Sequence, residues 1–341
     1  MKQGTASDEK SIIVEHLIKN FEVTKKRGGL AGSITSLFKP DKKIVTALKK
    51  ISFSVSPGEL VGFIGPNGAG KTTTLKVLSG LLYPTAGFIQ VLGYDPWERK
   101  PDFLKKISFV MGQKNQLWWD LPAIDTFELN REIYEIPVKK YKEILTELTR
   151  VLEAGKLLDV QVRKLSLGQR MRLELISSLL HEPEVLFLDE PTIGLDVVAQ
   201  QKVRDFIFQY NKSRKATILL TSHNMGDLID LAKRVIVIDK GKILFDGNLR
   251  ELVVKFAKTK LIKANLSEEA DLKLIENIGE VKKISFPQVV VSVPREATAI
   301  AAAELLQNLP VDDLTIEEEP IEETIRRLFK GEIELLKNKK S

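Results

Sequence analysis

A glycine-rich segment at residues 65–73 is the feature that most constrains the fold of this chain. An apolar run that predicts a strand, Leu60–Ile64, comes directly before it, and an apolar helical pattern, Thr74–Leu82, follows it. The segment fits the pattern G-x-x-x-x-G-K-[ST] at every position. Its residues are Gly65, Pro66, Asn67, Gly68, Ala69, Gly70, Lys71, Thr72 and Thr73. Glycines let the backbone curl around an anion, so that N–H groups and a helix N-terminus face a phosphate.

Two side chains of this loop are suited to a nucleoside triphosphate. Lys71 can reach the β- and γ-phosphates, and the Thr72 hydroxyl can bind Mg²⁺. The alternative interpretation is a glycine-rich turn that only connects a strand to a helix. The complete motif in its strand–loop–helix context favours a phosphate loop, so we expect ATP and Mg²⁺ as ligands.

A second predicted strand, Val185–Leu188, ends in two carboxylates, Asp189 and Glu190. Ligands of open α/β sheets bind at the carboxyl edge of the strands. Asp189 is suited to the Mg²⁺ shell, and Glu190 to the general base that polarises the attacking water, a role worth roughly 10²–10⁴ in rate. Alone, this pattern is equally well explained by a strand followed by a charged loop. Beside a complete phosphate loop, it indicates ATP hydrolysis.

Strand-like and helix-like segments alternate from Ile51 to about Leu249. The strand-like runs are short, β-branched and almost continuously apolar, as in a parallel sheet buried on both faces. Two further strands are predicted, at Ala216–Thr221 and Val235–Ile238. Apolar residues recur at helical spacing over Lys139–Leu152 and Gln169–Leu180. This alternation predicts an α/β fold.

The character of the sequence changes after Leu252. The pattern then predicts the order βαββαβ and a closing amphipathic helix, which together indicate a small α+β unit. The predicted strands are Thr259–Ala264, Lys282–Phe286, Val289–Val293 and Val311–Glu317. The predicted helices are Glu269–Asn277, Arg295–Leu309 and Ile321–Lys330.

Composition excludes several classes of protein. Hydrophobic residues make up 43% and charged residues 29%, which supports buried cores and argues against disorder. The absence of cysteine excludes disulfides, thiolate catalysis and Cys-based metal sites. No run reaches the ~18–20 apolar residues of a spanning helix, and Met1–Ser11 lacks an apolar signal core. The net charge of +6 only weakly favours anionic partners.

Further motifs occur in a fixed order along the chain. They are Gln113, Leu165-Ser166-Leu167-Gly168-Gln169 at the start of a helix, Gly194-Leu195-Asp196 after the Asp-Glu pair, and His223 at the end of a later strand. Together with the phosphate loop, this order over residues 10–250 resembles the nucleotide-binding subunit of an ABC transporter. The insert before Ala47-Leu48, the segment Gln116–Pro122 and the tail Asp312–Ile321 resemble one branch, the export-type ATPases similar to sodium- and drug-extrusion ATPases.

The resemblance implies a fold and a division into domains. The fold class is α/β, a P-loop NTPase of the ABC type with a helical subdomain at about 114–180 and a small C-terminal α+β domain. We expect a flexible N-terminus at 1–10, the ABC ATPase domain at 11–252, and an accessory domain at 253–341.

The resemblance also implies a head-to-tail dimer with two ATP molecules between the subunits. Ser166, Gly168 and Gln169 would lie at a helix N-terminus that points at the γ-phosphate held by the opposite subunit. The hydroxyl, the N–H groups and the positive helix end would respond to the charge lost on hydrolysis. Asp196 would cross the dimer interface. Leu167 stands where the family has a glycine. The leucine reduces backbone freedom and would thereby affect the rate at which the dimer closes.

The remaining roles follow from the same resemblance. Gln113 would contact Mg²⁺ and water while its loop touches the permease, and His223 would help to hold Glu190 and the water in line. The expected catalytic residues are therefore Glu190, His223 and Gln113, and the expected metal ligands are Thr72, Gln113 and Asp189.

Several features leave alternatives open. Phe21 matches the aromatic residue that stacks on adenine in the family, Phe38 is a second candidate, and both are also explained as core aromatics. The basic insert 25–43 is a solvated loop or an amphipathic element that touches a membrane or a partner. Trp118 and Trp119 are packing residues or a permease anchor. His16 and His181 are interpreted as structural, and the position of His181 near a helix C-terminus favours a basic group.

Three hypotheses for the function follow. The first is an ATPase that forms a homodimer, or a dimer with a similar ATPase subunit, peripheral at the cytoplasmic face of the membrane. It powers a separate multi-spanning permease in the export direction. The second is an ABC-type ATPase of nucleic-acid metabolism, which lacks support because the chain has one cassette, no coiled-coil insert and no aromatic–basic ladder. The third is an ATP-binding scaffold without turnover, which Glu190 and His223 oppose. The transported substrate is not encoded in these motifs.

Overall fold

The computed structural model describes residues 10–24, 42–112, 114–222, 228, 231–249, 251–252, 257–269 and 272–330. Residues 1–9, most of the basic insert with Phe38, Gln113 and His223 lie outside this described part. The chain divides into two compact units, Met1–Gly247 and Asn248–Ser341.

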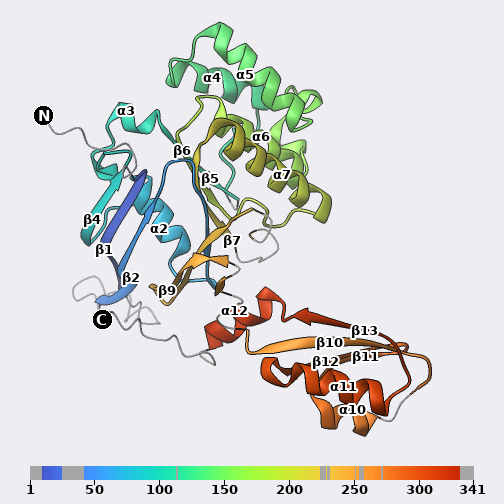
Figure 1. Cartoon of the computed structure of the whole chain (residues 1–341). Coiled ribbons are helices and arrows are strands. Elements are labelled where there is room, and N and C mark those ends of the chain that lie inside the picture. Colours follow the sequence, from blue (N-terminus) through green and yellow to red (C-terminus); the bar gives the residue numbers. More distant parts are fainter. Residues whose placement is uncertain are drawn as a thin grey trace, which may run out of the picture. The chain divides into compact units, whose positions relative to one another are not determined.

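A six-stranded sheet forms the centre of the first unit. Its strands are β3 (Leu60–Ile64), β5 (Ile107–Met111), β6 (Val185–Asp189), β7 (Thr217–Ser222), β8 (Arg234–Asp239) and β9 (Lys242–Asn248). They lie in the order β5-β6-β7-β3-β8-β9, and the neighbours from β5 through β8 in this order pair in parallel. Figure 1 labels β5, β6, β7 and β9 of this sheet. Every residue of β3 and β7 is buried. The four strands predicted for this sheet are confirmed to within one residue at each end, because strands buried on both faces have continuous apolar runs.

A smaller antiparallel sheet completes the core of the first unit. It contains β1 (Ile12–Thr24), β2 (Lys42–Val55) and β4 (Ala86–Val91), in the order β2-β1-β4. Leu75 and Leu78 of helix α2 (Lys71–Leu78) share one buried cluster with strands of both sheets, so α2 is packed between the sheets (Figure 1). This burial fixes the residues before α2, which are those of the phosphate loop.

Two boundaries in this region differ from the sequence-based prediction. The strand predicted at Ile12–Ile18 continues to Thr24, because β2 pairs with β1 along its whole length. The helical pattern Thr74–Leu82 gives a helix that starts at Lys71 and ends at Leu78. Gly80 has a φ of 71°, and a left-handed glycine just after a helix ends it.

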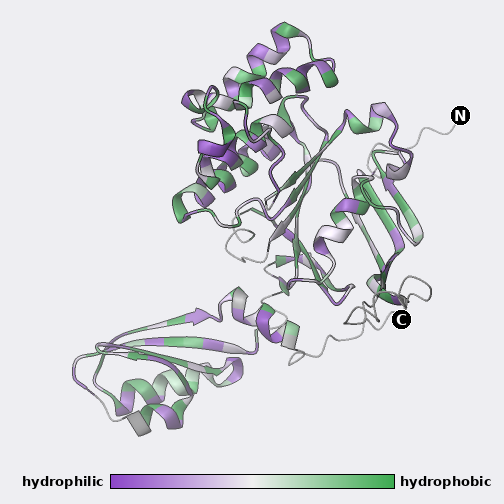
Figure 2. Ribbon diagram, turned by 180° about the vertical axis from the view of Figure 1, so that it is seen from behind, coloured by the Kyte–Doolittle hydropathy of each residue, from purple (hydrophilic) through white to green (hydrophobic). Residues whose placement is uncertain are grey.

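The remaining helices of the first unit are mostly amphipathic. They are α3 (Pro101–Leu104), α4 (Ala123–Ile133), α5 (Val138–Val151), α6 (Leu167–Leu179) and α7 (Val197–Arg214). In α5 the buried residues are Tyr141, Ile144 and Leu148, at helical spacing, and the ribbon in Figure 2 alternates between hydrophobic and hydrophilic colours along these helices. The helices predicted at Lys139–Leu152 and Gln169–Leu180 are confirmed. Among the described residues, no helix combines the length and the apolarity needed to span a bilayer.

The second unit has the predicted βαββαβ order and a core of its own. Its elements are β10 (Thr259–Leu266), α10 (Leu272–Ile278), β11 (Glu280–Ser285), β12 (Gln288–Pro294), α11 (Thr298–Asn308), β13 (Val311–Glu318) and α12 (Ile321–Lys330). The strands form an antiparallel sheet in the order β11-β12-β10-β13 (Figure 1). Ile262, Val291 and Leu305 are fully buried together between this sheet and the helices. The predicted α+β class of this unit is therefore confirmed.

Candidate functional site

The phosphate loop connects β3 to α2 through backbone conformations that favour glycine. Gly68 and Gly70 have φ values of 78° and 116°. A Cβ atom on Gly70 would lie 2.7 Å from Cδ2 of Leu48, and one on Gly65 would lie 2.3 Å from the carbonyl oxygen of Ile238. Glycine is therefore required both for the left-handed turn and for the close approach of neighbouring strands.

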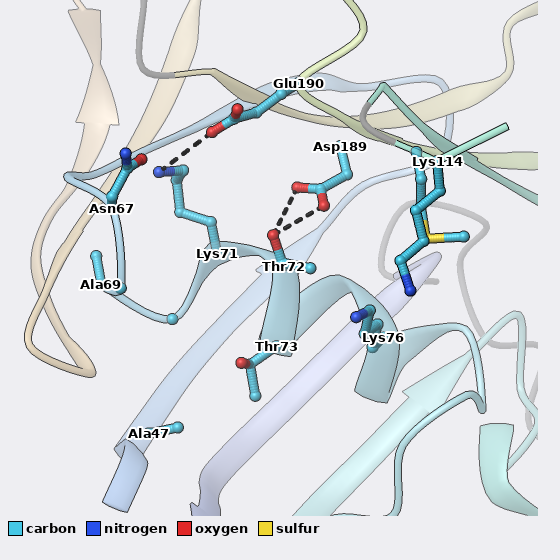
Figure 3. A pocket seen from close by; sticks show the side chains of 13 residues that line it. Ala47, Asn67, Ala69, Lys71, Thr72, Thr73, Lys76, Lys114, Asp189 and Glu190 are labelled. Carbon is cyan, nitrogen blue, oxygen red and sulfur yellow. Dashed lines mark hydrogen bonds and ion pairs between the residues drawn. The ribbon is translucent and has the colours of Figure 1, made fainter. Parts of the chain in front are cut away.

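Lys71 is the first residue of α2 and is only 5% exposed. Its Nζ donates hydrogen bonds to the carbonyl oxygens of Gly65, at 2.5 Å, and Pro66, at 3.2 Å, and lies 3.7 Å from Oε1 of Glu190. Burial lowers the pKa of Lys71, and the carboxylates of Glu190 and Asp189 oppose that shift. The ammonium group is thus held by its own loop, beside the proposed general base (Figure 3).

Asp189 and Thr72 are brought together, as the motifs predict. The Thr72 hydroxyl donates to the Asp189 carboxylate, with Oγ1 at 2.8 and 3.0 Å from its two oxygens (Figure 3). Thr221 of β7 donates to the same carboxylate at 2.7 Å. A hydroxyl and a carboxylate are the hard oxygen ligands that Mg²⁺ prefers, and Mg²⁺ needs few of them when substrate phosphates supply the rest. The donor set therefore fits Mg²⁺, and the ligand roles stay predictions.

Glu190 is held in an unusual backbone conformation. Its φ is 53°, and its N–H donates to the carbonyl oxygen and to the hydroxyl oxygen of Thr221, both at 3.1 Å. A Cβ on Gly112, at the end of β5, would lie 2.1 Å from the Glu190 carbonyl oxygen. Non-glycine residues at positive φ persist only where their surroundings enforce the conformation. Here β5 and β7 enforce it, and the Glu190 side chain faces Lys71.

These residues surround one cavity of about 440 Å³ (Figure 3). Its lining residues are Ala47, Asn67, Gly68, Ala69, Gly70, Lys71, Thr72, Thr73, Lys76, Met111, Lys114, Asp189 and Glu190. Seven of the nine phosphate-loop residues and both carboxylates that the sequence nominates are therefore in the lining. Gly65 and Pro66 shape the loop from behind, as acceptors for Lys71.

Several residues of the site were not nominated from the sequence. Lys76 and Lys114 add two cations to the cavity lining, and Thr221 and Gly112 position the carboxylates. Lys76 is four residues after Thr72, so helical spacing places both on one face of α2 and could have revealed it. Thr221 and Gly112 come from other strands, and only the sheet order brings them to Asp189 and Glu190.

Phe21 is not among the residues that line the cavity. It lies on β1 opposite Val45, is 36% exposed, and has the Lys19 ammonium 5.0 Å from its ring centroid. Ala47, two residues beyond Val45 on β2, is the hairpin residue that reaches the cavity. The alternative that Phe21 is a core aromatic is wrong, because its side chain is exposed, and its role in adenine stacking stays a prediction.

The helix that begins after Ser166 has a complete capping box. The Ser166 hydroxyl accepts from the Gln169 N–H at 3.3 Å, and Gln169 Oε1 accepts from the Ser166 N–H at 2.9 Å. Asp196 caps α7 by accepting from the Ala199 N–H at 2.9 Å. A Cβ on Gly168 would lie 3.2 Å from Cβ of Ala199. The two helix N-termini are therefore packed together, and neither lines the cavity of its own chain.

Leu167 fills the space over a left-handed glycine. A Cβ on Gly194, whose φ is 71°, would lie 2.8 Å from Cδ2 of Leu167. The leucine that departs from the family pattern thus packs on the turn that leads to Asp196.

His181 is structural, as expected, but it does not act as a charged group at the end of α6. Burial lowers its pKa to about 4, so the imidazole is neutral at pH 7. Its Nε2 lies 3.0 Å from the Ile107 carbonyl oxygen, and its ring stacks on Tyr134 with centroids 3.9 Å apart. The favourable basic charge expected here is therefore wrong, because the ring is enclosed between α4, α6 and β5.

This neutral histidine makes a pH-dependent contribution to stability. Its folded pKa of about 4 lies below the unfolded value near 6.5. The contribution is therefore complete above about pH 6.5 and is lost as the pH falls toward 4, up to about 3 kcal/mol. We expect urea unfolding at pH 7 and pH 4 to show a larger fall for the wild type than for His181→Gln. Equal falls in both proteins would contradict a neutral imidazole at this position.

Comparison with known proteins gives the family. The family model described as "ABC transporter" matches residues 48–193, and the model "EvrA-like ABC transporter, C-terminal domain" matches residues 258–317. The ABC transporter ATP-binding protein NatA of Bacillus subtilis (strain 168) is 31% identical over 215 residues, which cover 63% of this chain and 87% of NatA. The chain belongs to the ABC transporter ATP-binding proteins. The family predicted from the motifs is thereby confirmed.

Further relatives agree with this assignment. The bacitracin transport ATP-binding protein BcrA of Bacillus licheniformis is 35% identical over 194 residues, which cover 57% of this ABC protein and 62% of BcrA. The solved dimeric structure of a post-hydrolysis state of the ATP-binding cassette MJ0796, bound to ADP and Pi, has a TM-score of 0.58 at 22% identity. It covers 70% of this chain and 99% of the cassette, and it confirms the predicted P-loop NTPase fold. This chain is therefore the ATP-binding subunit of an ABC transporter.

Proposed function

We propose that this ABC ATPase hydrolyses Mg-ATP in the cavity around Lys71 and thereby powers a separate multi-spanning permease. One observation carries the proposal: Lys71, the Thr72–Asp189 pair and Glu190 line the same cavity of about 440 Å³. A phosphate-binding cation, an oxygen ligand pair for Mg²⁺ and a general base are the parts that phosphoryl transfer to water requires.

Each side chain has a distinct part in the proposed reaction. Lys71 exchanges its carbonyl partners for the β- and γ-phosphate oxygens, and Glu190 orients a water in line with the γ-phosphate and accepts its proton. Thr72 and Asp189 would hold Mg²⁺, which when bound neutralises charge on the phosphates. Gln113 and His223 keep the roles implied by the resemblance. Gln113 would bind Mg²⁺ and water, and His223 would contact the γ-phosphate.

The second half of the site is proposed to come from another copy of the chain. Ser166, Gly168, Gln169 and Asp196 are absent from the lining of their own cavity, yet they form two adjacent helix N-termini. Helix N-termini with free N–H groups bind phosphate. A symmetric head-to-tail homodimer would bring this surface to the γ-phosphate of the partner.

A second cavity, of about 610 Å³, is an open groove that we propose receives the permease, and it is called the groove from here on. Leu81, Leu104, Phe109 and Ile133 give it apolar walls, and Arg99 adds a cation. Met111, at the end of β5, lines both this groove and the nucleotide cavity. A movement at the end of β5 would therefore change both surfaces at once.

The proposed location of the protein follows from this docking. The protein would be peripheral at the cytoplasmic face of the membrane, held there by its permease. Export is proposed as the direction because the sequence resembles the export-type branch. We test the function by reconstituting the subunit with its permease in proteoliposomes and measuring phosphate release. Stimulation by the permease is expected, and copurification with RNA in place of a membrane protein would contradict the proposal.

Trp118 is proposed to anchor the permease at the rim of the groove. Its side chain is 50% exposed, and its backbone nitrogen donates to the hydroxyl oxygen of Thr126, a groove residue, at 3.5 Å. Truncated tryptophan anchors commonly cost ~2 kcal/mol or more. We therefore expect Trp118→Ala to weaken permease binding about 30-fold, measured by sedimentation with the proteoliposomes, at an unchanged Kd for MgATP.

Phe208→Ala is the control for this prediction, because Phe208 is an exposed aromatic residue of α7 outside the groove. Unaltered permease binding by Trp118→Ala would leave Trp118 without a docking role.

A further inference from the structure

Glu174 is a carboxylate buried in the interior of the first unit. It lies on α6 and is only 1% exposed. Its nearest polar partners are both distant, with Arg170 Nε at 3.6 Å and the Gln116 N–H nitrogen at 3.4 Å from Oε1. Burial raises the pKa of Glu174 to about 7, and Arg170 and the Gln116 N–H oppose that shift. Buried ionisable groups normally have close partners, and replacing them with apolar residues often stabilises a protein.

The partners of Glu174 belong to the segment that forms the groove. Gln116 lines the groove, and its side-chain Nε2 donates to the Phe109 carbonyl oxygen of β5 at 2.8 Å. Leu117, the next residue, is 3% exposed. The segment is thus attached to β5 on one side and to α6, through Glu174, on the other.

Arg170 extends this connection to the tryptophan pair. It lies one turn before Glu174 on α6, and its guanidinium carbon is 5.8 Å from the ring centroid of Trp119. This distance is within the range of cation–π attraction. Two side chains on one face of α6 therefore contact the segment: Glu174 contacts Gln116, and Arg170 contacts Trp119.

We propose that Glu174 is a positioning residue that fixes the groove segment Gln116–Trp119 against α6, the helix that begins at Ser166. Because α6 also supplies Ser177 and Ser178 to the groove wall, the two walls keep one relative position while Glu174 holds Gln116. The Glu174 carboxylate therefore affects permease binding indirectly, by fixing the shape of the groove in which the permease docks. The inference rests on the proposed docking of a permease in this groove.

A neutral isostere tests this role. Glu174→Gln keeps the size of the side chain. At pH 8, above the Glu174 pKa of about 7, it also removes the charge that attracts the backbone N–H of Gln116 and the guanidinium of Arg170. We expect at least a 10-fold rise in the permease concentration that half-maximally stimulates phosphate release, with the Kd for MgATP within 2-fold of wild type. Glu143→Gln, an exposed glutamate of α5, makes the same charge change and is expected to leave both values unchanged.

A double-mutant cycle separates positioning from a merely structural role. If Glu174 acts through the segment, the effects of Glu174→Gln and Trp119→Phe on half-maximal stimulation are not additive. In a background with Trp97→Phe and Trp118→Phe, Trp119 is the remaining tryptophan. Its emission should shift to longer wavelength in Glu174→Gln, because Trp119 becomes more exposed. If Glu174→Gln does not fold, Arg170→Gln removes the link to Trp119 and should show the same rise.

The outcomes distinguish this inference from the proposed function. If the wild type is not stimulated by the permease, the docking proposal itself is wrong. If the wild type is stimulated and Glu174→Gln matches Glu143→Gln, or if the two effects add, then Glu174 has no positioning role.

Discussion

Replacing Glu190 with glutamine is expected to lower the steady-state rate of ATP hydrolysis by about 10²–10⁴-fold. Glutamine keeps the shape of the side chain but cannot accept a proton from the attacking water. The backbone of residue 190 is held by Thr221 and by the close approach of Gly112, so the substitution should leave the fold of the site intact. Phosphate release under saturating MgATP measures this change.

ATP binding should survive the same substitution. Lys71 lies 3.7 Å from the Glu190 carboxylate, and removing that negative charge leaves the ammonium freer to bind phosphates. We therefore expect an equal or tighter Kd for MgATP in Glu190→Gln, and an ATP-stabilised dimer. Glu184→Gln is the matched control, since Glu184 is exposed just before the start of β6. Turnover at the wild-type rate in Glu190→Gln would remove Glu190 from the role of general base.

Substituting Lys71 with methionine is the second change with a large expected effect. The ammonium is the one cation held by the phosphate loop itself, through the carbonyl oxygens of Gly65 and Pro66. Hydrogen bonds to charged groups contribute about 1.5–3 kcal/mol each, so the loss of contacts to two phosphates should weaken MgATP binding about 100-fold or more. Methionine keeps the aliphatic stem in the buried site, and turnover should be lost with binding.

Isothermal titration with MgATP measures the effect of Lys71→Met. Lys139→Ala, an exposed lysine of α5, removes the same charge from the chain at a distant place and should not change the Kd. An unchanged Kd in Lys71→Met would mean that the nucleotide does not occupy the cavity of the phosphate loop.

The sequence predicts those parts of the site that lie in continuous segments. The phosphate loop is local, because one strand, one turn and one helix place Lys71 and Thr72. The Asp189–Glu190 pair follows directly from a buried strand that ends at the sheet edge. The C-terminal α+β unit was also predictable, since its strands and helices have clear apolar periodicity and distinct turns.

Other parts depend on contacts between distant segments and could not be predicted. Thr221 reaches Asp189 because β7 lies beside β6, and a single sequence does not give strand order. Glu174 meets Gln116 across 58 positions of the chain, and its helical pattern alone gives an ordinary amphipathic helix. The sequence predicts that the first strand ends at Ile18, where polar residues follow, although pairing with β2 continues β1 past Phe21.

The capping residues bear on the proposal that a second copy of the chain completes the site. Ser166, Gln169 and Asp196 each have a complete local explanation as helix caps, and caps of this kind contribute about 1 kcal/mol. Their packing side by side, with Leu167 over Gly194, is not required by capping. It gives a surface with two helix N-termini, which fits an anion bound by a second copy.

The direct test of this shared site is complementation between two inactive variants. Lys71→Met disables the phosphate loop, and Ser166→Asp disables the opposite surface by charge repulsion while keeping a good helix cap. In a mixed dimer, one site would combine the intact phosphate loop of the Ser166→Asp copy with the intact Ser166 surface of the Lys71→Met copy. We predict that mixing the two proteins restores phosphate release well above the sum of the separate proteins. A mixture as inactive as its components, under conditions where mixed dimers form, would contradict a nucleotide held between two copies.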